Sequence, residues 1–141
     1  MGNLNKNSAG YHLLAVAGVS LLLLFVIFHL LDLTLGVQPA ASGDFQGAVD
    51  GNHAAYQNLI ASFDRPLVAL VYIAAMVVLF LHLSHGIWTA ASDLGITGHR
   101  WRQVFLWLSY LVPAIVLIGN ISIPIAVMMG ILEPVPFMPA G

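Results

Sequence analysis

Three long runs of apolar residues constrain this chain more than any other feature. They cover about residues 11–35, 66–92 and 103–132. A helix needs about 20 apolar residues to cross the roughly 30 Å hydrocarbon layer, so each run is long enough. Membrane strands need only about 9–11 residues, so the length of the runs excludes strands. We expect an all-α membrane protein with one transmembrane domain over residues 1–141. Its outer loop, 36–65, has room for a short helix over about 54–63.

The composition also favours a membrane protein. Of the 141 residues, 60% are hydrophobic and only 7% are charged, whereas a soluble domain carries about a quarter charged residues. The net charge of −2 argues against nucleic acid as a partner. The chain has no cysteine and therefore supplies neither a disulfide nor a thiolate ligand. Its polar first ten residues and long first apolar run do not match a cleaved signal peptide.

The basic residues predict how the chain is oriented in the membrane. Lys6, Arg100 and Arg102 fall on one side of the three predicted helices, and Arg65 alone falls on the other. Cytoplasmic loops carry an excess of Lys and Arg. We therefore expect a multi-pass protein of the cell's inner (plasma) membrane, with a cytoplasmic N-terminus and with the outer loop and C-terminus outside.

Two histidines lie within the apolar runs, at His29 and His82. Ionisable groups inside a bilayer are energetically unfavourable and usually mark functional sites. Because the two helices start on opposite sides, His29 should lie towards the outer surface and His82 towards the inner one. Their depths then differ by roughly 10–15 Å. We expect two metal centres, stacked across the membrane, with one of these histidines on each.

Haem b fits such centres, because it needs one or two imidazoles and a slot for a flat ring. Gly18 lies eleven residues before His29 and Gly86 lies four after His82, so each glycine shares a helix face with its histidine. This chain has too few membrane histidines to supply both ligands of each iron. We expect two haems shared with a second anchor chain that carries matching histidines. The alternative is that the histidines bond across helices and the glycines serve packing.

Two segments of the chain carry a resemblance to a known family. Phe25–Gly36 and Leu81–Gly95 resemble the b558-class cytochrome b subunit of succinate dehydrogenase and fumarate reductase. Over about residues 10–130, the chain resembles the last three helices of that family's five-helix anchor, which implies a split anchor. The resemblance maps the family's His-x3-Gly pattern onto His82 and Gly86, for the inner haem. It maps the outer haem ligand onto His29.

The resemblance implies a membrane anchor subunit of succinate:quinone oxidoreductase, the respiratory complex II that also serves the tricarboxylic acid cycle. A flavoprotein and an iron–sulfur subunit would oxidise succinate, and this chain would pass electrons through haem to a quinone, with menaquinone favoured. The chain has no dinucleotide motif and would perform no succinate chemistry itself. One departure concerns a glutamate that some relatives carry two residues before the inner ligand. Phe80 stands there in this chain, which puts that proton path in doubt.

The second histidine of the LHLSHG segment, His85, leaves several interpretations open. It can contact a haem propionate, bind quinone or replace His82 as the axial ligand. His82 and His85 can also form the two-histidine side of a Rieske-type iron–sulfur cluster, if a partner supplies the cysteines. For a quinone we expect His85, Trp88, Ser92 and Arg100 to provide donors and an apolar slot. The alternative is that Trp88 belongs to an aromatic belt and that Arg100 only fixes the topology.

Other polar residues within the runs have plainer interpretations. Asp32 follows His29 by one turn and can serve a proton or a propionate, or can be a helix-end acid among the headgroups. Pro113, Asn120 and Pro124 predict a kinked third helix and not a site.

Two rival functions remain from the sequence. One is a haem-b membrane subunit of a hydrogenase or a formate dehydrogenase, which would share the buried histidines and dock another soluble partner. The other is a haem-free anchor, whose histidines only form hydrogen bonds or hold a cluster shared with a partner.

Overall fold

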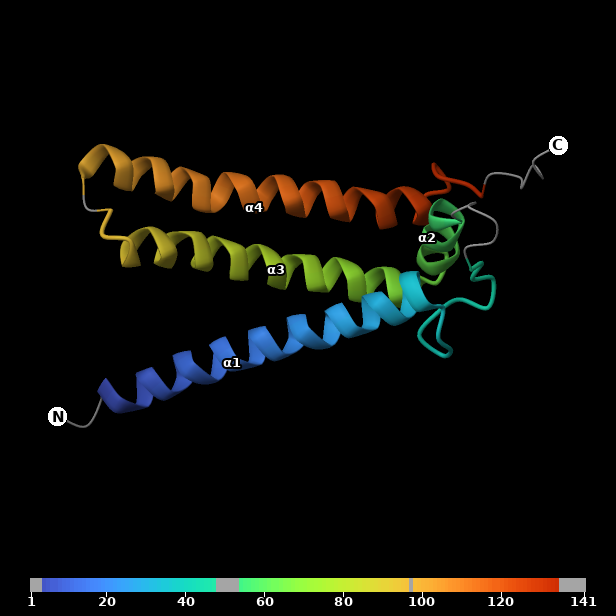
Figure 1. Cartoon of the computed structure of the whole chain (residues 1–141), viewed down its shortest axis with the longest axis horizontal. Coiled ribbons are helices and arrows are strands. Elements are labelled where there is room, and N and C mark those ends of the chain that lie inside the picture. The colour runs from blue at the N-terminus through green and yellow to red at the C-terminus, as the bar shows by residue number, and fades with distance from the viewer. Residues whose placement is uncertain (1–3, 48–53, 97, 135–141) are drawn as a thin grey trace. The chain divides into compact units, whose positions relative to one another are not determined.

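The computed structural model describes residues 4–47, 54–96 and 98–134, and within the first helix the side chains of residue 13 and of residues 16 onward. The helices are α1 (Leu4–His29), the π-helix η1 (Leu30–Leu35), α2 (Ala55–Phe63), α3 (Pro66–Asp93) and α4 (His99–Met128) (Figure 1). The described residues contain no strand. Three segments, Val16–Leu35, Pro66–Asp93 and His99–Met128, are long and apolar enough to cross a membrane. This confirms the all-helical class and the three candidate membrane spans.

The long helices bury little of their apolar surface within this chain. Only 6% of the most apolar window of Val16–Leu35 is buried, and the corresponding shares are 22% for α3 and 17% for α4. Large apolar side chains such as Leu24, Leu67 and Ile118 are exposed. A helix that is apolar on all sides is stable only when lipid or other helices surround it. The sequence therefore builds spans that depend on the bilayer and on neighbouring helices.

The described residues group into two compact units. The first comprises residues up to 25 together with 75–119, and the second comprises 26–74 together with 120 onward. The prediction of a single transmembrane domain stays a prediction. Lys6, which was used to predict the orientation, lies outside the residues whose side chains are described.

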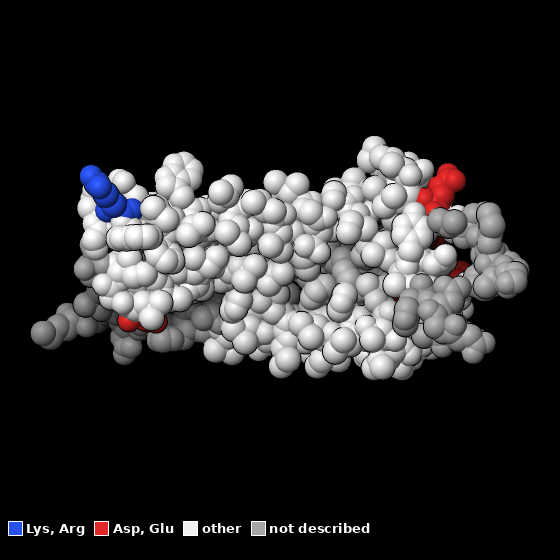
Figure 2. Space-filling view, turned by 45° about the horizontal axis from the view of Figure 1, so that its top comes forward, with Lys and Arg blue, Asp and Glu red and all other residues white. Residues whose placement is uncertain are grey.

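In the first unit, α3 and α4 run side by side in opposite directions from a tight turn (Figure 1). Gly95 adopts a φ of 71°, which glycine accepts without steric penalty. Its N–H donates to the Ser92 carbonyl at 3.0 Å, and the Ile96 N–H donates to the Ala91 carbonyl at 3.2 Å. These two bonds form a Schellman cap, which ends α3 and lets α4 begin at His99. Figure 2 shows Lys or Arg atoms at this turn, with a few acidic atoms at the same end and uncharged helical surface beside them.

In the second unit, α2 packs on η1 and holds the outer loop. Its buried side chains include Ile60 and Phe63. The side chain of Asn58 accepts from the Gln46 N–H at 2.7 Å and donates to the Gln46 carbonyl at 2.8 Å. One amide side chain thereby satisfies both polar groups of a loop residue, which fixes the loop against α2.

Gly36 ends η1 in a left-handed conformation, with φ at 66°. A Cβ placed on Gly36 would collide with the ring of Phe45. Gly36→Ala therefore meets two penalties, and we expect it to lower the free energy of unfolding by about 2–4 kcal/mol. Thermal unfolding of the purified protein in detergent measures this loss. Gly43→Ala is the matched control, because a Cβ there meets nothing within 4 Å. Equal losses for the two variants would contradict the prediction.

Candidate functional site

A buried charge cluster lies in the second unit, where the first membrane span ends. The carboxylate of Asp32 is only 1% exposed. It accepts hydrogen bonds from the hydroxyl of Ser62, from Arg65 Nη2 at 2.6 Å and from the Tyr72 hydroxyl at 2.9 Å. We call these four residues the Asp32 cluster. A carboxylate removed from water needs several donors and an opposite charge, and the cluster supplies both.

Four local features of the chain bring these residues together. Asp32 lies within η1, and π-helical turns are frequent at functional sites. Ser62 lies at the buried end of α2. Arg65 immediately precedes Pro66, which opens α3 without loss of a hydrogen bond because proline has no N–H. Tyr72 is buried within α3.

The arginine also fixes the outer loop. Arg65 Nη1 donates to the Ala40 carbonyl at 2.9 Å, while Nη2 forms the ion pair with Asp32. Its Nε is buried and has no hydrogen-bond partner. One guanidinium thus joins the loop, the end of α2 and the end of the first span. In the structure the carboxylate of Asp32 has three protein donors, Ser62, Arg65 and Tyr72. A proton or propionate role for Asp32, or a place among headgroups, stays a prediction.

Tyr72 links this cluster to His29. The two rings meet edge to face, with centroids 5.9 Å apart and planes at 62°. Tyr72 also packs edge to face against Phe28 and Phe63, at 5.9 Å and 4.9 Å. Because its hydroxyl is held by Asp32 and its ring by two phenylalanines, the Tyr72 ring lies in a fixed position beside the imidazole. The His29 side chain is exposed, and Tyr72 packs against one side of its ring.

His82 and His85 lie on α3 in the first unit, and both side chains are exposed. A Cβ placed on Gly18 or on Gly86 would meet nothing within 4 Å. The helix faces that carry these glycines are therefore not closed by the chain itself. In the part of the chain that the structure describes, no three His, Cys, Asp or Glu side chains gather to hold a metal ion.

The histidines fit haem better than they fit a complete protein-built metal site. Axial ligation needs one accessible imidazole per chain and an open neighbouring face for the macrocycle. His29 and His82 are exposed, and a Cβ on Gly18 or Gly86 meets no other part of this chain. A Rieske-type cluster would have to draw both cysteines from a partner, since this sequence has none.

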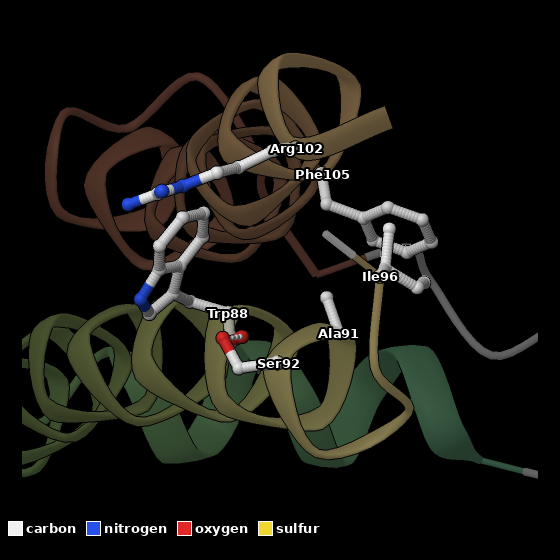
Figure 3. A pocket seen from close by; sticks show the side chains of 6 residues that line it. All are labelled: Trp88, Ala91, Ser92, Ile96, Arg102 and Phe105. Carbon is white, nitrogen blue, oxygen red and sulfur yellow. Dashed lines mark hydrogen bonds between the residues drawn. The ribbon is translucent and has the colours of Figure 1, made fainter. Parts of the chain in front are cut away.

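The first unit holds a cavity of about 180 Å³ at the α3–α4 turn (Figure 3). It is lined by Trp88, Ala91, Ser92, Ile96, Arg102 and Phe105. The Ser92 hydroxyl donates to the Trp88 carbonyl at 3.0 Å. Two of the residues expected for quinone, Trp88 and Ser92, therefore share a cavity. His85 and Arg100 do not line it.

The arginine that lines this cavity is Arg102. Its Cζ lies 5.5 Å from the centroid of the Trp88 ring, in a cation–π contact. Arg100 is exposed on the first turn of α4. The sequence placed Arg100 in the predicted quinone site, and Arg102 was used only to predict the orientation. Each residue of an α-helix is turned by about 100° from the one before it, so two residues that are two positions apart point to nearly opposite sides.

Sequence reasoning also missed the Asp32 cluster as a unit. The available signal was an acid inside an apolar run and a single arginine on the same predicted side of the membrane. Comparison with protein-family models, with curated proteins and with solved structures finds no match to this chain. The geometry and the sequence therefore carry the functional argument alone.

Proposed function

We propose that this chain is a membrane anchor subunit of a succinate:quinone oxidoreductase. Together with a second anchor chain it binds haem b and passes electrons from an iron–sulfur subunit to a membrane quinone. The supporting observation is a pair of exposed imidazoles, His29 and His82, on apolar helices whose adjacent glycine faces are open. Ionisable groups inside a bilayer are unfavourable and usually mark functional sites, which supports a ligand role for these two imidazoles.

The proposed roles follow from the residues present. His29 and His82 each hold one haem iron on one side, with matching histidines of the partner on the other. Bound haem b supplies reversible one-electron transfer. Tyr72 orients the imidazole of His29, because the Asp32 cluster fixes its ring. His85 contacts a propionate or the quinone. The resemblance favours menaquinone and places succinate oxidation on the flavoprotein partner.

The predicted orientation is part of the proposal. The only basic residue of the outer loop, Arg65, is paired with buried Asp32, so its charge is compensated. Arg100 and Arg102 near the α3–α4 turn form no ion pair within the described residues. An excess of Lys and Arg marks the cytoplasmic side, and two of the four Lys and Arg residues of the chain lie at this turn. The N-terminus and the α3–α4 turn would then be cytoplasmic, and the C-terminus would lie outside the plasma membrane.

Purification of the tagged chain from its native membrane tests this function. We expect a flavoprotein with covalently bound FAD and an iron–sulfur subunit to co-purify. A reduced-minus-oxidised spectrum should show the α-band of b-type haem. Co-purification of a nickel or molybdenum subunit would instead identify a hydrogenase or formate dehydrogenase. Absence of the α-band would remove haem from the proposal and favour the shared iron–sulfur cluster.

A further inference from the structure

The cavity at the α3–α4 turn has a polar end and an apolar end. Figure 3 shows the guanidinium of Arg102 and the indole nitrogen of Trp88 on the same side. The side chains of Ile96 and Phe105 lie on the opposite side, and Ala91 lies between. We call this cavity the turn pocket. A ligand that suits it has a polar group at one end and an apolar part at the other.

The polar end carries a charge that nothing in the described chain neutralises. Among the side chains that the structure describes, at residues 13, 16–47, 54–96 and 98–134, the sole ion pair joins Arg65 and Asp32. Arg102 instead lies against the Trp88 ring at 5.5 Å. A guanidinium remains charged at any physiological pH and offers five N–H donors in a fixed plane. Stacking on the indole holds that plane, so its donors are oriented before a ligand arrives.

We propose that the turn pocket binds the phosphate of an acidic glycerophospholipid. The phosphate would accept a bidentate pair of hydrogen bonds from Arg102, with the indole N–H of Trp88 as a further donor. The start of an acyl chain would pack on Ile96 and Phe105. Basic pockets between transmembrane helices on the cytoplasmic side are suited to acidic headgroups. The apolar end favours a lipid over free phosphate.

A quinone fits the same pocket less well. The Trp88 face on which its ring would stack is the face that Arg102 covers. A quinone is also neutral and would leave the guanidinium charge uncompensated. The lipid assignment takes from the proposed function only the cytoplasmic position of the turn, and it does not depend on haem or on succinate. The proposed function needs a quinone near the inner haem and not in this pocket. Under this assignment Trp88, which was predicted to bind quinone, binds a lipid instead. His85 remains a predicted quinone contact.

Native mass spectrometry of the full chain, purified with its bound subunits in detergent, tests the assignment. After lipid depletion, the protein is titrated with dioleoyl phosphatidylglycerol, with dioleoyl phosphatidylcholine or with inorganic phosphate. We expect one phosphatidylglycerol to bind in preference to phosphatidylcholine, and inorganic phosphate not to displace it. Arg102→Gln should weaken this binding about tenfold. Arg100→Gln is the matched control, since it removes an equal charge two residues away, outside the pocket.

A second variant keeps the test decisive if Arg102→Gln folds poorly. Ala91→Leu fills the pocket and leaves the guanidinium in place, so it should also exclude the lipid. Unchanged lipid binding in either variant would overturn the proposal. If Arg100→Gln and Arg102→Gln weaken phosphatidylglycerol binding equally, the lipid is attracted by the overall charge of the turn and not bound in the pocket, which would contradict the proposal. Loss of co-purifying quinone, with lipid binding intact, in Arg102→Gln would show that the pocket takes quinone.

Discussion

Replacing His29 with alanine is expected to remove one haem from the purified complex, and replacing His82 is expected to remove the other. Each imidazole is proposed to ligate its own iron, and alanine offers no ligand in its place. The two residues lie on different helices, α1 and α3. Haem is counted per complex from the pyridine haemochrome spectrum. Each single variant should retain about half of the wild-type haem, and the double variant should retain none.

His99→Ala serves as the matched control, because His99 begins α4 outside the predicted haem faces and is exposed. It should keep both haems. Loss of neither haem, or equal loss of both in each single variant, would argue against one ligand per centre. If His85→Ala removes the inner haem while His82→Ala retains it, the axial ligand is His85.

Replacing Arg65 with methionine should cause a large loss of stability. The change leaves the carboxylate of Asp32 buried without its cation, and breaking a buried ion pair costs about 3–5 kcal/mol. We expect a value near 3 kcal/mol, the lower end of that range, because the Arg65 side chain is 30% exposed. Unfolding in detergent with increasing denaturant measures the change. The loop that Arg65 holds through the Ala40 carbonyl should become more sensitive to protease.

A double-mutant cycle separates the pair from general damage. Asp32→Asn combined with Arg65→Met removes both charges, so the double variant should be more stable than the sum of the single losses predicts, by at least about 1 kcal/mol. Asp64→Asn is the control, since Asp64 is exposed and the described chain gives it no ion pair. Additive losses would mean that Asp32 and Arg65 do not stabilise the fold as a pair.

The sequence predicted the spans well because their length and apolar character are local properties. The short helix α2 could also be predicted, because its segment lies between turn residues. The ends were harder to place from hydropathy. The third apolar run continues to about residue 132, whereas α4 ends at Met128 because Gly130 takes a φ of 68° and caps the helix. Backbone capping, and not side-chain polarity, decides that boundary.

The Asp32 cluster was not predictable, because its members meet only in the tertiary structure. Arg65 lies 33 residues from Asp32 and Tyr72 lies 40 away. A single sequence indicates that an acid in an apolar run needs partners, but it does not name them. The sequence also predicted Arg100 for the pocket that Arg102 lines, and the cause is similar. The sequence gives their spacing, and only the packing of α4 on α3 decides which of them faces Trp88.

The pairing of Asp32 with Arg65 has a consequence for biosynthesis. The first span leaves the ribosome with an acid near its end, and its cation is synthesised 33 residues later. An aspartate at the centre of a translocating helix opposes insertion by about 2.5–3.5 kcal/mol, and less towards its end. Until Arg65 emerges, the nascent helix carries that carboxylate alone. The first span therefore enters the lipid stably only after Arg65, at the start of the second span, has been synthesised.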